Sequence, residues 1–460
     1  MKSTKTQAHP VKPLTEIITL LVCIAPQLEA SSLRQLTQVI YGMLVVTGRV
    51  TMLGLSRWTE KGGSYRSIQR FYHSALPWKA IQWSFFRKCF LKPEDEYIVA
   101  GDEVVVSKAG KKTHGLDRFF SGVQQQVIPS VSFFTFSLVN VRDEQSYPLQ
   151  ASQTVKSAEE KAASKAKAEA KKVKKAGKPG RPKGSRNKAK QAMVLNPELV
   201  RIQTALQSLL KTVDATIRLK YVAMDGHFGN YPSAYMIRQS CLHLISKLRS
   251  DAALYLAFAG EHSGPGRKPK YGAKIDVRHM DAKFLKETSL KGHLRTDIYQ
   301  GQFYNKEFAF ALNVVVMVKT NLQTHSQAHV ILFSTDLEQA FATIIKFYSL
   351  RFQIEFNFRD AKQYWGLEDF MNVKEVAVTN AANLAFFMVN FSCALLQPFR
   401  QQNLDYSILD LKSHYRGCRY VSETIKMLPE KPDAILLDDI FQHIAQLGAI
   451  HPLFQSVVSP

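Results

Sequence analysis

The sequence predicts an α/β protein in which a helical segment precedes a mixed sheet, and in which the sheet carries a β-rich insertion. Apolar residues recur at helical spacing up to about residue 92. Apolar, β-rich runs then follow at 97–106 and 127–141, and strand-like residues fill about 243–325. With 460 residues, two or three modules are expected.

Along the chain, core segments are expected to alternate with added segments. A basic arm and then a β-rich insertion interrupt the core, and helices lie at both ends. The predicted ranges are 1–92 (helical domain), 93–152 (core), 153–195 (basic arm, largely disordered), 196–242 (core), 243–327 (β-rich insertion), 328–399 (core with a long helix) and 400–460 (helices).

The charge balance favours a polyanionic partner. Lys and Arg number 61 against 38 Asp and Glu, which gives a formal net charge of +23. Nucleic acid and acidic membrane surfaces both fit this excess. A hydrophobic share of 45% excludes a largely disordered chain. The 5 cysteines are scattered, without the paired spacing of a zinc site, and they suit a reducing cytoplasm.

Two apolar stretches raise the question of a membrane span, which needs about 20 uninterrupted apolar residues. The stretch 14–29 is shorter than such a span and contains Glu16 and Pro26. The stretch 376–399 contains several asparagines. Amides without partners are costly in lipid. Both stretches are therefore predicted to be buried helices of a cytoplasmic protein without a membrane partner.

The second half of the helical domain is basic and aromatic. In residues 64–72, SYRSIQRFY, Arg66 and Arg70 are four apart and lie on one face of the predicted helix. That face is a candidate DNA-binding surface. Packed helices with surface arginines have the same pattern, so both interpretations stay open.

Charge is concentrated in a basic arm between residues 156 and 190, which hold 14 Lys or Arg against 3 Glu. Its Ala-rich first part has nothing large and apolar to bury, so it is at most a solvated helix. Prolines hold the second part, KPGRPKGSRNK, in an extended path. An extended strand carrying Arg181 and Arg186 fits a minor groove about 6 Å wide. A flexible linker kept soluble by lysines fits equally well. A second piece of this kind, GPGRKPK, occupies 264–270.

Two predicted strands each carry a carboxylate. Asp102 lies within the apolar run 97–106, and Asp225 closes the run LKYVAMD at 219–225. Acidic residues at such positions can converge at one edge of a mixed sheet. A strand edge and a turn are the plain structural explanations for the two residues.

Helix starts are also marked in the sequence. Asn196-Pro197 is expected to begin a helix before the strand that ends at Asp225. After a last strand at 330–333, Thr335 or Asp336 is expected to cap a helix that continues through the 340s to the 360s.

This last helix has a polar stripe. Tyr348, Arg351, Glu355 and Lys362 are spaced three, four and seven residues apart, which places them on one helix face. A phenol and two cations around a carboxylate suit a phosphate backbone laid across the helix. An ordinary salt bridge between Arg351 and Glu355 would give the same spacing.

Asp102, Asp225 and Glu355 are candidate catalytic residues and metal ligands. Three converging carboxylates need cations to offset their charge. Two Mg²⁺ ions about 3.5–4 Å apart would do so, and they would activate a water and stabilise the leaving oxygen of a phosphodiester. Mn²⁺ suits the same oxygen ligands.

The string Tyr-x2-Arg-x3-Glu-x6-Lys at 348–362 resembles the third catalytic block of DDE transposases of bacterial insertion sequences, in the insertion sequence four family. Asp102 and Asp225 precede it in the order of that family. The sequence DGHFGN at 225–230 is similar to the second block. The resemblance covers roughly residues 95–370, and the interval before Glu355 has room for the β-strand insertion of that family.

The resemblance implies a ribonuclease-H-like core in which Asp102, Asp225 and Glu355 ligate two Mg²⁺ ions. It implies that Tyr348, Arg351 and Lys362 hold DNA phosphates beside the cleaved end. The implied enzyme binds the terminal inverted repeats of a mobile element, cleaves them, and joins the 3′ hydroxyl ends to target DNA. It would work in the bacterial nucleoid as a homodimer on DNA, by a cut-and-paste route with a hairpin intermediate.

Two features depart from the family. Members with hairpin chemistry hold a flipped base with an aromatic residue of the insertion, typically Trp, and the 4 Trp residues here lie outside it. Phe303, Tyr304 or Phe308 is the available substitute. The basic arm is an addition, and we expect it to bind DNA without sequence preference.

Two other classes of function stay open at the level of sequence. One is a ribonuclease-H-like nuclease or resolvase that cuts without strand transfer. The other is a DNA-binding descendant of a transposase that has lost catalysis, although the presence of all three acids argues against it.

Overall fold

The computed structural model describes residues 13–59, 62–173, 193–213, 216–261, 265–430 and 432–453. The strands are β1 (Tyr97–Ser107), β2 (Asp117–Ser121), β3 (Gln126–Asn140), β4 (Gln145–Gln153), β5 (Tyr221–Met224), β6 (His243–Leu248), β7 (Leu254–Ala257), β8 (Tyr271–Lys274), β9 (Leu285–Lys291), β10 (Leu294–Asn305), β11 (Ala311–Asn321) and β12 (Gln327–Ser334).

The α-helices are α1 (Pro13–Leu21), α2 (Ala30–Val45), α3 (Met52–Ser56), α4 (Tyr65–His73), α5 (Trp78–Cys89), α6 (Ala158–Val173), α7 (Pro197–Val213), α8 (Tyr231–Gln239), α9 (Phe341–Leu350), α10 (Gln353–Gln363), α11 (Glu375–Arg400), α12 (Ile408–Met427) and α13 (Ala434–Ala445). Short 3₁₀ helices cover Val22–Gln27, Gly226–Phe228 and Ala282–Phe284.

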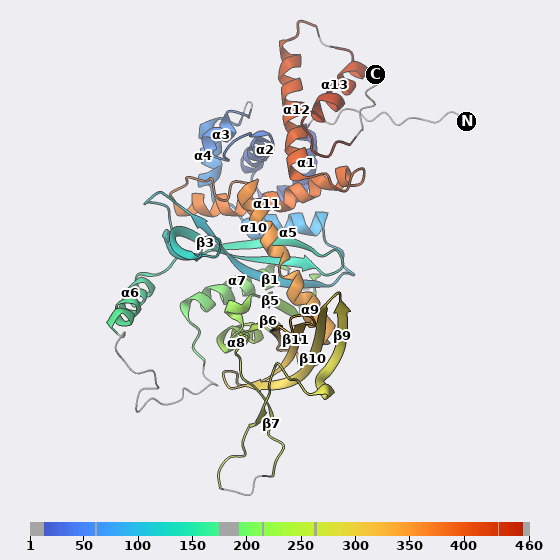
Figure 1. Ribbon diagram of the computed structural model, residues 1–460. Helices are drawn as coiled ribbons and strands as arrows, with labels where there is room; N and C mark the ends of the chain where they lie inside the picture. Colours follow the sequence, from blue (N-terminus) through green and yellow to red (C-terminus); the bar gives the residue numbers. More distant parts are fainter. Residues whose placement is uncertain are drawn as a thin grey trace, which may run out of the picture.

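The described strands form one mixed sheet, which confirms the α/β prediction. The path runs β2-β3-β1-β5-β6-β12-β11-β10-β7-β8, with β4 paired to β3 and β9 paired to β10. β1 is antiparallel to β3 but parallel to β5, and β5 is parallel to β6. α11 and the N-terminal helices lie above the core strands in Figure 1, and α7 and α8 lie below them.

The β-rich insertion extends the core sheet instead of forming a sheet of its own. β6 falls inside the range expected for the insertion, but it pairs with β5 in the core. β12 returns antiparallel along β6, and β11, β10, β7 and β8 follow outward from it. The inserted strands are therefore β7 to β11.

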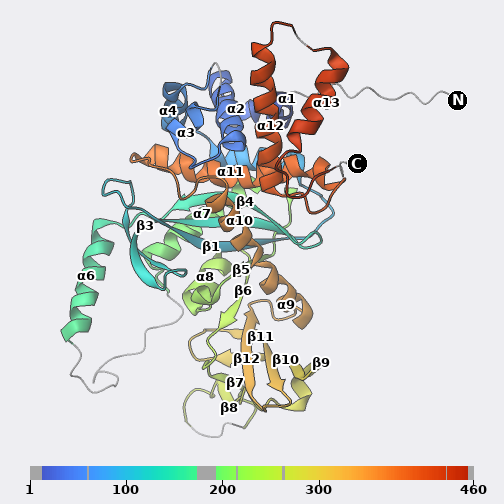
Figure 2. The same cartoon turned by 45° about the horizontal axis from the view of Figure 1, so that its top comes forward.

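The N-terminal helices share one hydrophobic core with the sheet and with α11. Asn380 of α11 is central to this packing: its Nδ2 donates to the backbone oxygens of Tyr72 and Ser74 at 2.8 Å each, and its Oδ1 accepts from Trp78 Nε1 at 2.7 Å. α12 packs against α2, and α11 packs against α4 and α5. Figure 2 shows these helices gathered at one end of the molecule.

α11 is the one helix in the described part of the chain that is long and apolar enough to cross a membrane. In its most apolar window, 83% of the residues are buried inside the protein. Asn380, Asn383 and Asn390 all have hydrogen-bond partners there. This is the environment expected of the core helix of a globular protein.

The long helix expected in the 340s to 360s is interrupted, which corrects the prediction. The amide of Phe352 donates to Ser349 O at 3.0 Å, and the amide of Ile354 donates to Arg351 O at 3.1 Å. These i→i−3 bonds tighten the chain into a 3₁₀-type turn between α9 and α10. The turn lets α9 pack on β5, β6 and β12 while α10 packs on β1, β4 and α11.

The cap expected for that helix is also wrong. α9 begins at Phe341, after Ala340, without a side-chain cap. Thr335 Oγ1 instead accepts from the amide of Leu244 at 3.0 Å, and Asp336 accepts from the Tyr221 hydroxyl at 2.8 Å. Both side chains join the end of β12 to β5 and β6. The cap of α7 is as predicted, because Asn196 Oδ1 accepts from the Leu199 amide at 2.8 Å.

The first part of the basic arm forms α6, which projects beside the sheet (Figure 1). Glu160 holds this helix to α7, since both of its oxygens lie 2.9–3.0 Å from Arg201 Nη1. The second part of the arm, with Arg181 and Arg186, lies outside the described residues.

Candidate catalytic site

Two of the three candidate acids are brought together by strand register. β1 and β5 are parallel, and Gly101 opposite Met224 is the last pair of the ladder. The next residue after Gly101 is Asp102, and the next residue after Met224 is Asp225. Parallel neighbours point to the same face of a sheet, so both carboxylates lie at the same edge, where β5 ends.

Arg351 links the third acid to the first. Its Nη1 lies 2.9 Å from Asp102 Oδ2, and its Nη2 lies 3.4 Å from Glu355 Oε1. The Arg351 and Asp102 side chains are only 12% and 20% exposed, whereas Glu355 is 43% exposed. The turn between α9 and α10 thus places one guanidinium between carboxylates of β1 and α10.

The acids influence one another electrostatically. The pKa of Asp102 is raised to about 6, chiefly by burial, with smaller contributions from the charges of Asp225 and Glu355. The Arg351 guanidinium opposes this rise and does not cancel it. A negative site of this kind is stabilised by additional positive charge.

The turn after β5 is tightly constrained. Asp225 Oδ1 accepts from the amide of His227 at 3.1 Å, and the Asp225 carbonyl accepts from Ser246 Oγ at 2.7 Å. A Cβ on Gly229 would lie 2.0 Å from Lys247 O of β6, so this position has no room for a side chain. The turn therefore fixes Asp225 against the neighbouring strand.

The His227 side chain is not packed in the core. Its side chain is 69% exposed, and its Nε2 lies 3.6 Å from Glu198 Oε1. The contact with Glu198 raises the pKa of His227.

The remaining residues of the stripe on α9 and α10 have partners within the protein. The Tyr348 ring lies 5.8 Å from the Arg351 guanidinium carbon, and burial raises the pKa of the Tyr348 hydroxyl. Lys362 Nζ donates to Val105 O at 2.9 Å and lies 3.3 Å from Glu368. Lys362 therefore attaches α10 to β1, a contact that spacing alone did not predict.

Arg66 and Arg70 lie on α4 with exposed side chains. The structure places them among the N-terminal helices, where Arg70 also borders a groove between α1 and α2. They are not part of the cluster formed by Asp102, Arg351 and Glu355.

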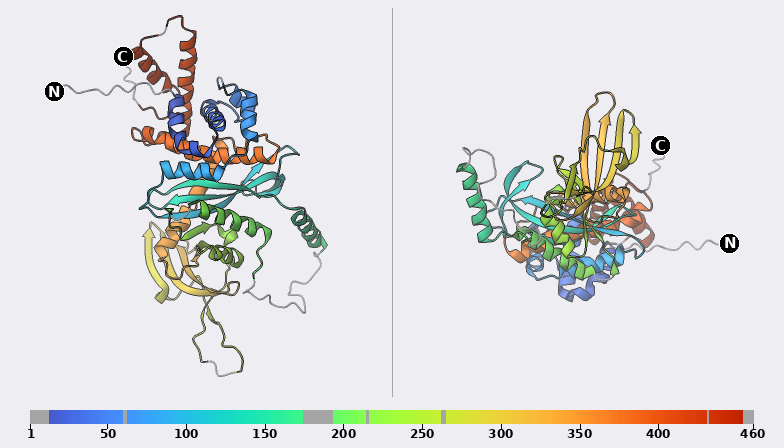
Figure 3. Two further views of the ribbon diagram at one scale, coloured as in Figure 1. Left: turned by 180° about the vertical axis from the view of Figure 1, so that it is seen from behind. Right: turned by 90° about the horizontal axis from the view of Figure 1, so that it is seen from below.

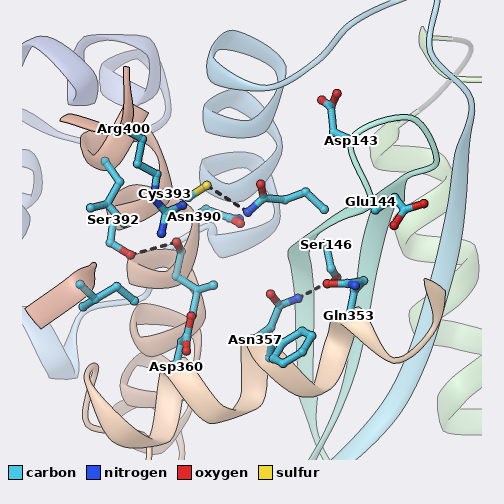
Figure 4. Close-up of a pocket in the computed structure, with 15 residues that line it drawn as sticks. Asp143, Glu144, Ser146, Gln353, Asn357, Asp360, Asn390, Ser392, Cys393 and Arg400 are labelled. Carbon is cyan, nitrogen blue, oxygen red and sulfur yellow. Dashed lines mark hydrogen bonds between the residues drawn. The ribbon is translucent and has the colours of Figure 1, made fainter. Parts of the chain in front are cut away.

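One buried polar residue of α10 was not singled out from the sequence. Asn357 on α10 is 5% exposed, and its Nδ2 donates to Ser146 Oγ at 2.7 Å. It borders a polar cavity of about 240 Å³ that also contacts Asp360, Asn390 and Arg400 (Figure 4). None of Asp102, Asp225 and Glu355 lines this cavity, so it lies apart from the candidate acids. The signal in the sequence that could have identified Asn357 is an asparagine on the predicted helix, two residues after Glu355.

The aromatic residues suggested as holders of a flipped base are mostly inaccessible. Phe303 is 0% exposed and Phe308 is 1% exposed, so neither can stack on a base. Both belong to the core of the inserted strands, and this corrects the expectation. Tyr304 is half-buried.

The donor set fits a hard divalent cation. Asp102, Asp225 and Glu355 supply only carboxylate oxygens, which are the ligands that Mg²⁺ and Mn²⁺ prefer. In this conformation no group of three His, Cys, Asp or Glu side chains within the described ranges is close enough to hold a metal ion. Arg351 Nε is buried without a hydrogen-bond partner in the described structure, so one donor of the guanidinium between the acids is unused.

Comparison with known families identifies the class of protein. Residues 23–300 match the DDE superfamily endonucleases, which is more than half of the chain. The chain therefore belongs to this family, and the mixed sheet is consistent with its nuclease-like fold. The match includes Asp102 and Asp225 and ends before Glu355.

The family supports an enzyme of the nuclease or transposase type that acts on DNA and uses divalent metal. A search of curated proteins found no match.

Proposed function

We propose that the protein is a DNA transposase with a ribonuclease-H-like core. It binds the ends of its mobile element, cleaves them by metal-dependent hydrolysis, and joins the 3′ hydroxyl ends to target DNA. The observation that carries the proposal is the Asp102–Arg351–Glu355 contact at the sheet edge where Asp225 follows β5. It joins Asp102, which lies within the family match, to Glu355, which lies outside it.

Asp102, Asp225 and Glu355 would hold the two Mg²⁺ ions. Bound there, the metal would activate a water and stabilise the leaving oxygen of the phosphodiester. Arg351 offsets the charge of two of the acids in the protein alone. On DNA, Arg351 and Tyr348 would contact the phosphate next to the cleaved bond. Lys362 would contact the same phosphate after its ion pair with Glu368 breaks.

The proposal includes DNA contacts beyond this site. The exposed Arg66 and Arg70 on α4 and the basic arm with Arg181 and Arg186 would bind the phosphate backbone, and two copies of the chain would hold the two ends together. Cut-and-paste transposition through a hairpin belongs to the same proposal. Of the aromatic residues suggested for the flipped base, Phe303 and Phe308 lie in the core, and Tyr304 has Lys270 over its ring.

The test is cleavage and joining of a labelled duplex made from the DNA that borders the gene, with Mg²⁺ present. We expect nicking and joined products from the wild type. Both should be lost, by at least about 100-fold, in Glu355→Gln, because the substitution keeps the shape but removes a metal-binding charge. Products are separated on denaturing gels.

The matched control is Glu375→Gln, which makes the same change on the exposed first turn of α11. Its products should equal those of the wild type. Nicking without joined products, with both ends present, would favour a nuclease without strand transfer. Binding without any chemistry in Mg²⁺ or Mn²⁺ would favour the inactive DNA-binding descendant.

A further inference from the structure

Three tyrosines share one face at the outer end of the sheet. In the β10–β7–β8 ladder, Tyr304 is opposite Tyr255, and Tyr255 is opposite Lys274. Residues directly opposite in a sheet point to the same face. The ring of Tyr271 completes the group, with centroids 5.7 Å from Tyr255 and 6.0 Å from Tyr304. We call this group the tyrosine face.

Two lysines lie over the tyrosine face from different segments. Lys270 Nζ is 4.9 Å from the centroid of Tyr304, and it donates to Ala309 O at 2.5 Å. Lys306 Nζ, from the turn after β10, is 4.6 Å from the centroid of Tyr255. Each ammonium also lies 5.9 Å from the ring of Tyr271. The rings thus hold two cations side by side at the surface.

The segment that leads into β8, together with β8 itself, adds more positive charge. Residues 265–274 contain Arg267, Lys268, Lys270 and Lys274 and no acidic residue. All four of these side chains are exposed. This is the second basic Gly/Pro segment of the sequence, and the proposed cleavage chemistry does not use it. Along the chain, Glu261 and Asp276 flank this segment, and Glu307 follows Lys306.

The backbones of β7 and β8 lie very close together beneath the tyrosine face. A Cβ on Gly272 would lie 2.7 Å from Ala257 O, so β8 approaches β7 more tightly than a side chain would allow. The two strands pair as a hairpin at the end of the sheet farthest from the N-terminal helices (Figure 3).

We propose that β7, β8, residues 265–270 and the turn after β10 form a second DNA-binding site that contacts the phosphate backbone of duplex DNA. The ring faces already carry ammonium groups, so bases cannot stack on them without displacing Lys270 and Lys306. Cations presented in this way suit phosphates, which give affinity without sequence preference. The inference rests on the proposed function in that DNA is the substrate.

The experiment measures duplex binding by fluorescence anisotropy in EDTA over a series of salt concentrations, using the full chain. The test variant is Lys268→Gln/Lys270→Gln. If each lysine neutralises one phosphate, the slope of log K against log salt falls by about 1.8 in magnitude, since each phosphate contributes about 0.9. Lys268→Arg/Lys270→Arg keeps the charge and should keep the wild-type slope.

The matched control removes the same charge elsewhere, as Lys88→Gln/Lys426→Gln on α5 and α12. An equal fall in slope in this control, or an unchanged slope in the hairpin variant, overturns the proposal. Thermal melting checks that the variants fold. Because the assay contains no divalent metal, it is independent of catalysis: binding through the hairpin with no cleavage in Mg²⁺ would overturn the proposed function alone.

Discussion

At the scale of single residues, Arg351 is the most consequential side chain of the candidate site. It contacts acids on β1 and α10, and its position depends on the 3₁₀-type turn that separates α9 from α10. Removing it would leave Asp102 buried beside two other acids without a cation, which would raise the pKa of Asp102 further.

We therefore predict a strong energetic coupling between Arg351 and Asp102. A double-mutant cycle with Arg351→Met and Asp102→Asn, measured by urea unfolding without divalent metal, should give about 1–3 kcal/mol. The pair Lys92 and Asp143, which is 47% and 33% exposed, is the control. Its coupling should stay below about 1 kcal/mol. Equal coupling for both pairs would contradict the prediction.

His414 gives a prediction on pH. Burial lowers the pKa of His414 to about 4, and its Nδ1 has no hydrogen-bond partner among the described residues. Between pH of about 6.5 and 4 the unfolded chain binds this proton and the folded chain does not. Stability should therefore fall through this window as the pH is lowered, by up to about 3 kcal/mol, and should change little from this group above it.

Urea unfolding as a function of pH measures this contribution. His414→Phe should remove it, so that the stability of the variant falls less between pH of about 6.5 and 4 than that of the wild type. His293→Phe, at an exposed position in the inserted strands, is the control and should keep the wild-type dependence. Parallel curves for His414→Phe and wild type would refute the assignment.

At the scale of elements, the turn after β5 decides where Asp225 lies. Gly226 begins the short 3₁₀ helix and Gly229 follows it, but the two glycines differ in their surroundings. A Cβ on Gly226 would meet its nearest atom at 3.5 Å, which is ordinary contact, whereas one on Gly229 would meet backbone of β6 at 2.0 Å.

We predict that Gly229→Ala destabilises the fold by about 2–4 kcal/mol, because backbone atoms must move to admit the methyl group. Gly226→Ala should cost less than about 1 kcal/mol. Urea unfolding of both variants measures the difference. A similar cost at both positions would show that the approach of β6 is not the constraint.

At the scale of the whole molecule, the helices of residues 13–89 are part of the main core. Asn380 of α11 binds two backbone oxygens at the end of α4 and the indole of α5. Polar contacts of this kind are buried and specific, so the N-terminal helices and the sheet are expected to unfold together.

Asn380→Leu tests this coupling. It leaves three buried polar groups without their partner, so we expect a loss of about 2–4 kcal/mol and a single unfolding transition. Far-UV circular dichroism and Trp fluorescence should report the same midpoint. Gln401→Leu, at the exposed end of α11, should be nearly neutral. Separate transitions for the two probes would mean that the N-terminal helices unfold on their own.

The sequence by itself determined the local features. A continuous apolar run predicted β1, periodic apolar residues predicted the N-terminal helices, and Asn196 marked the start of α7 correctly. The acid within β1, the acid that follows β5 and the spacing of Arg351 and Glu355 could also be recognised, because each depends on neighbours within one turn or one strand.

Only the tertiary structure decided which distant residues meet. The register that places Asp102 beside Asp225, the extension of the core sheet into the insertion, and the burial of Phe303 all depend on pairings between segments far apart in the chain. The periodic residues around Arg351 predict one continuous helix. The chain turns there instead, because α9 and α10 pack on different strands. Local pattern sets an element, but register, burial and helix direction follow from contacts that a single segment does not contain.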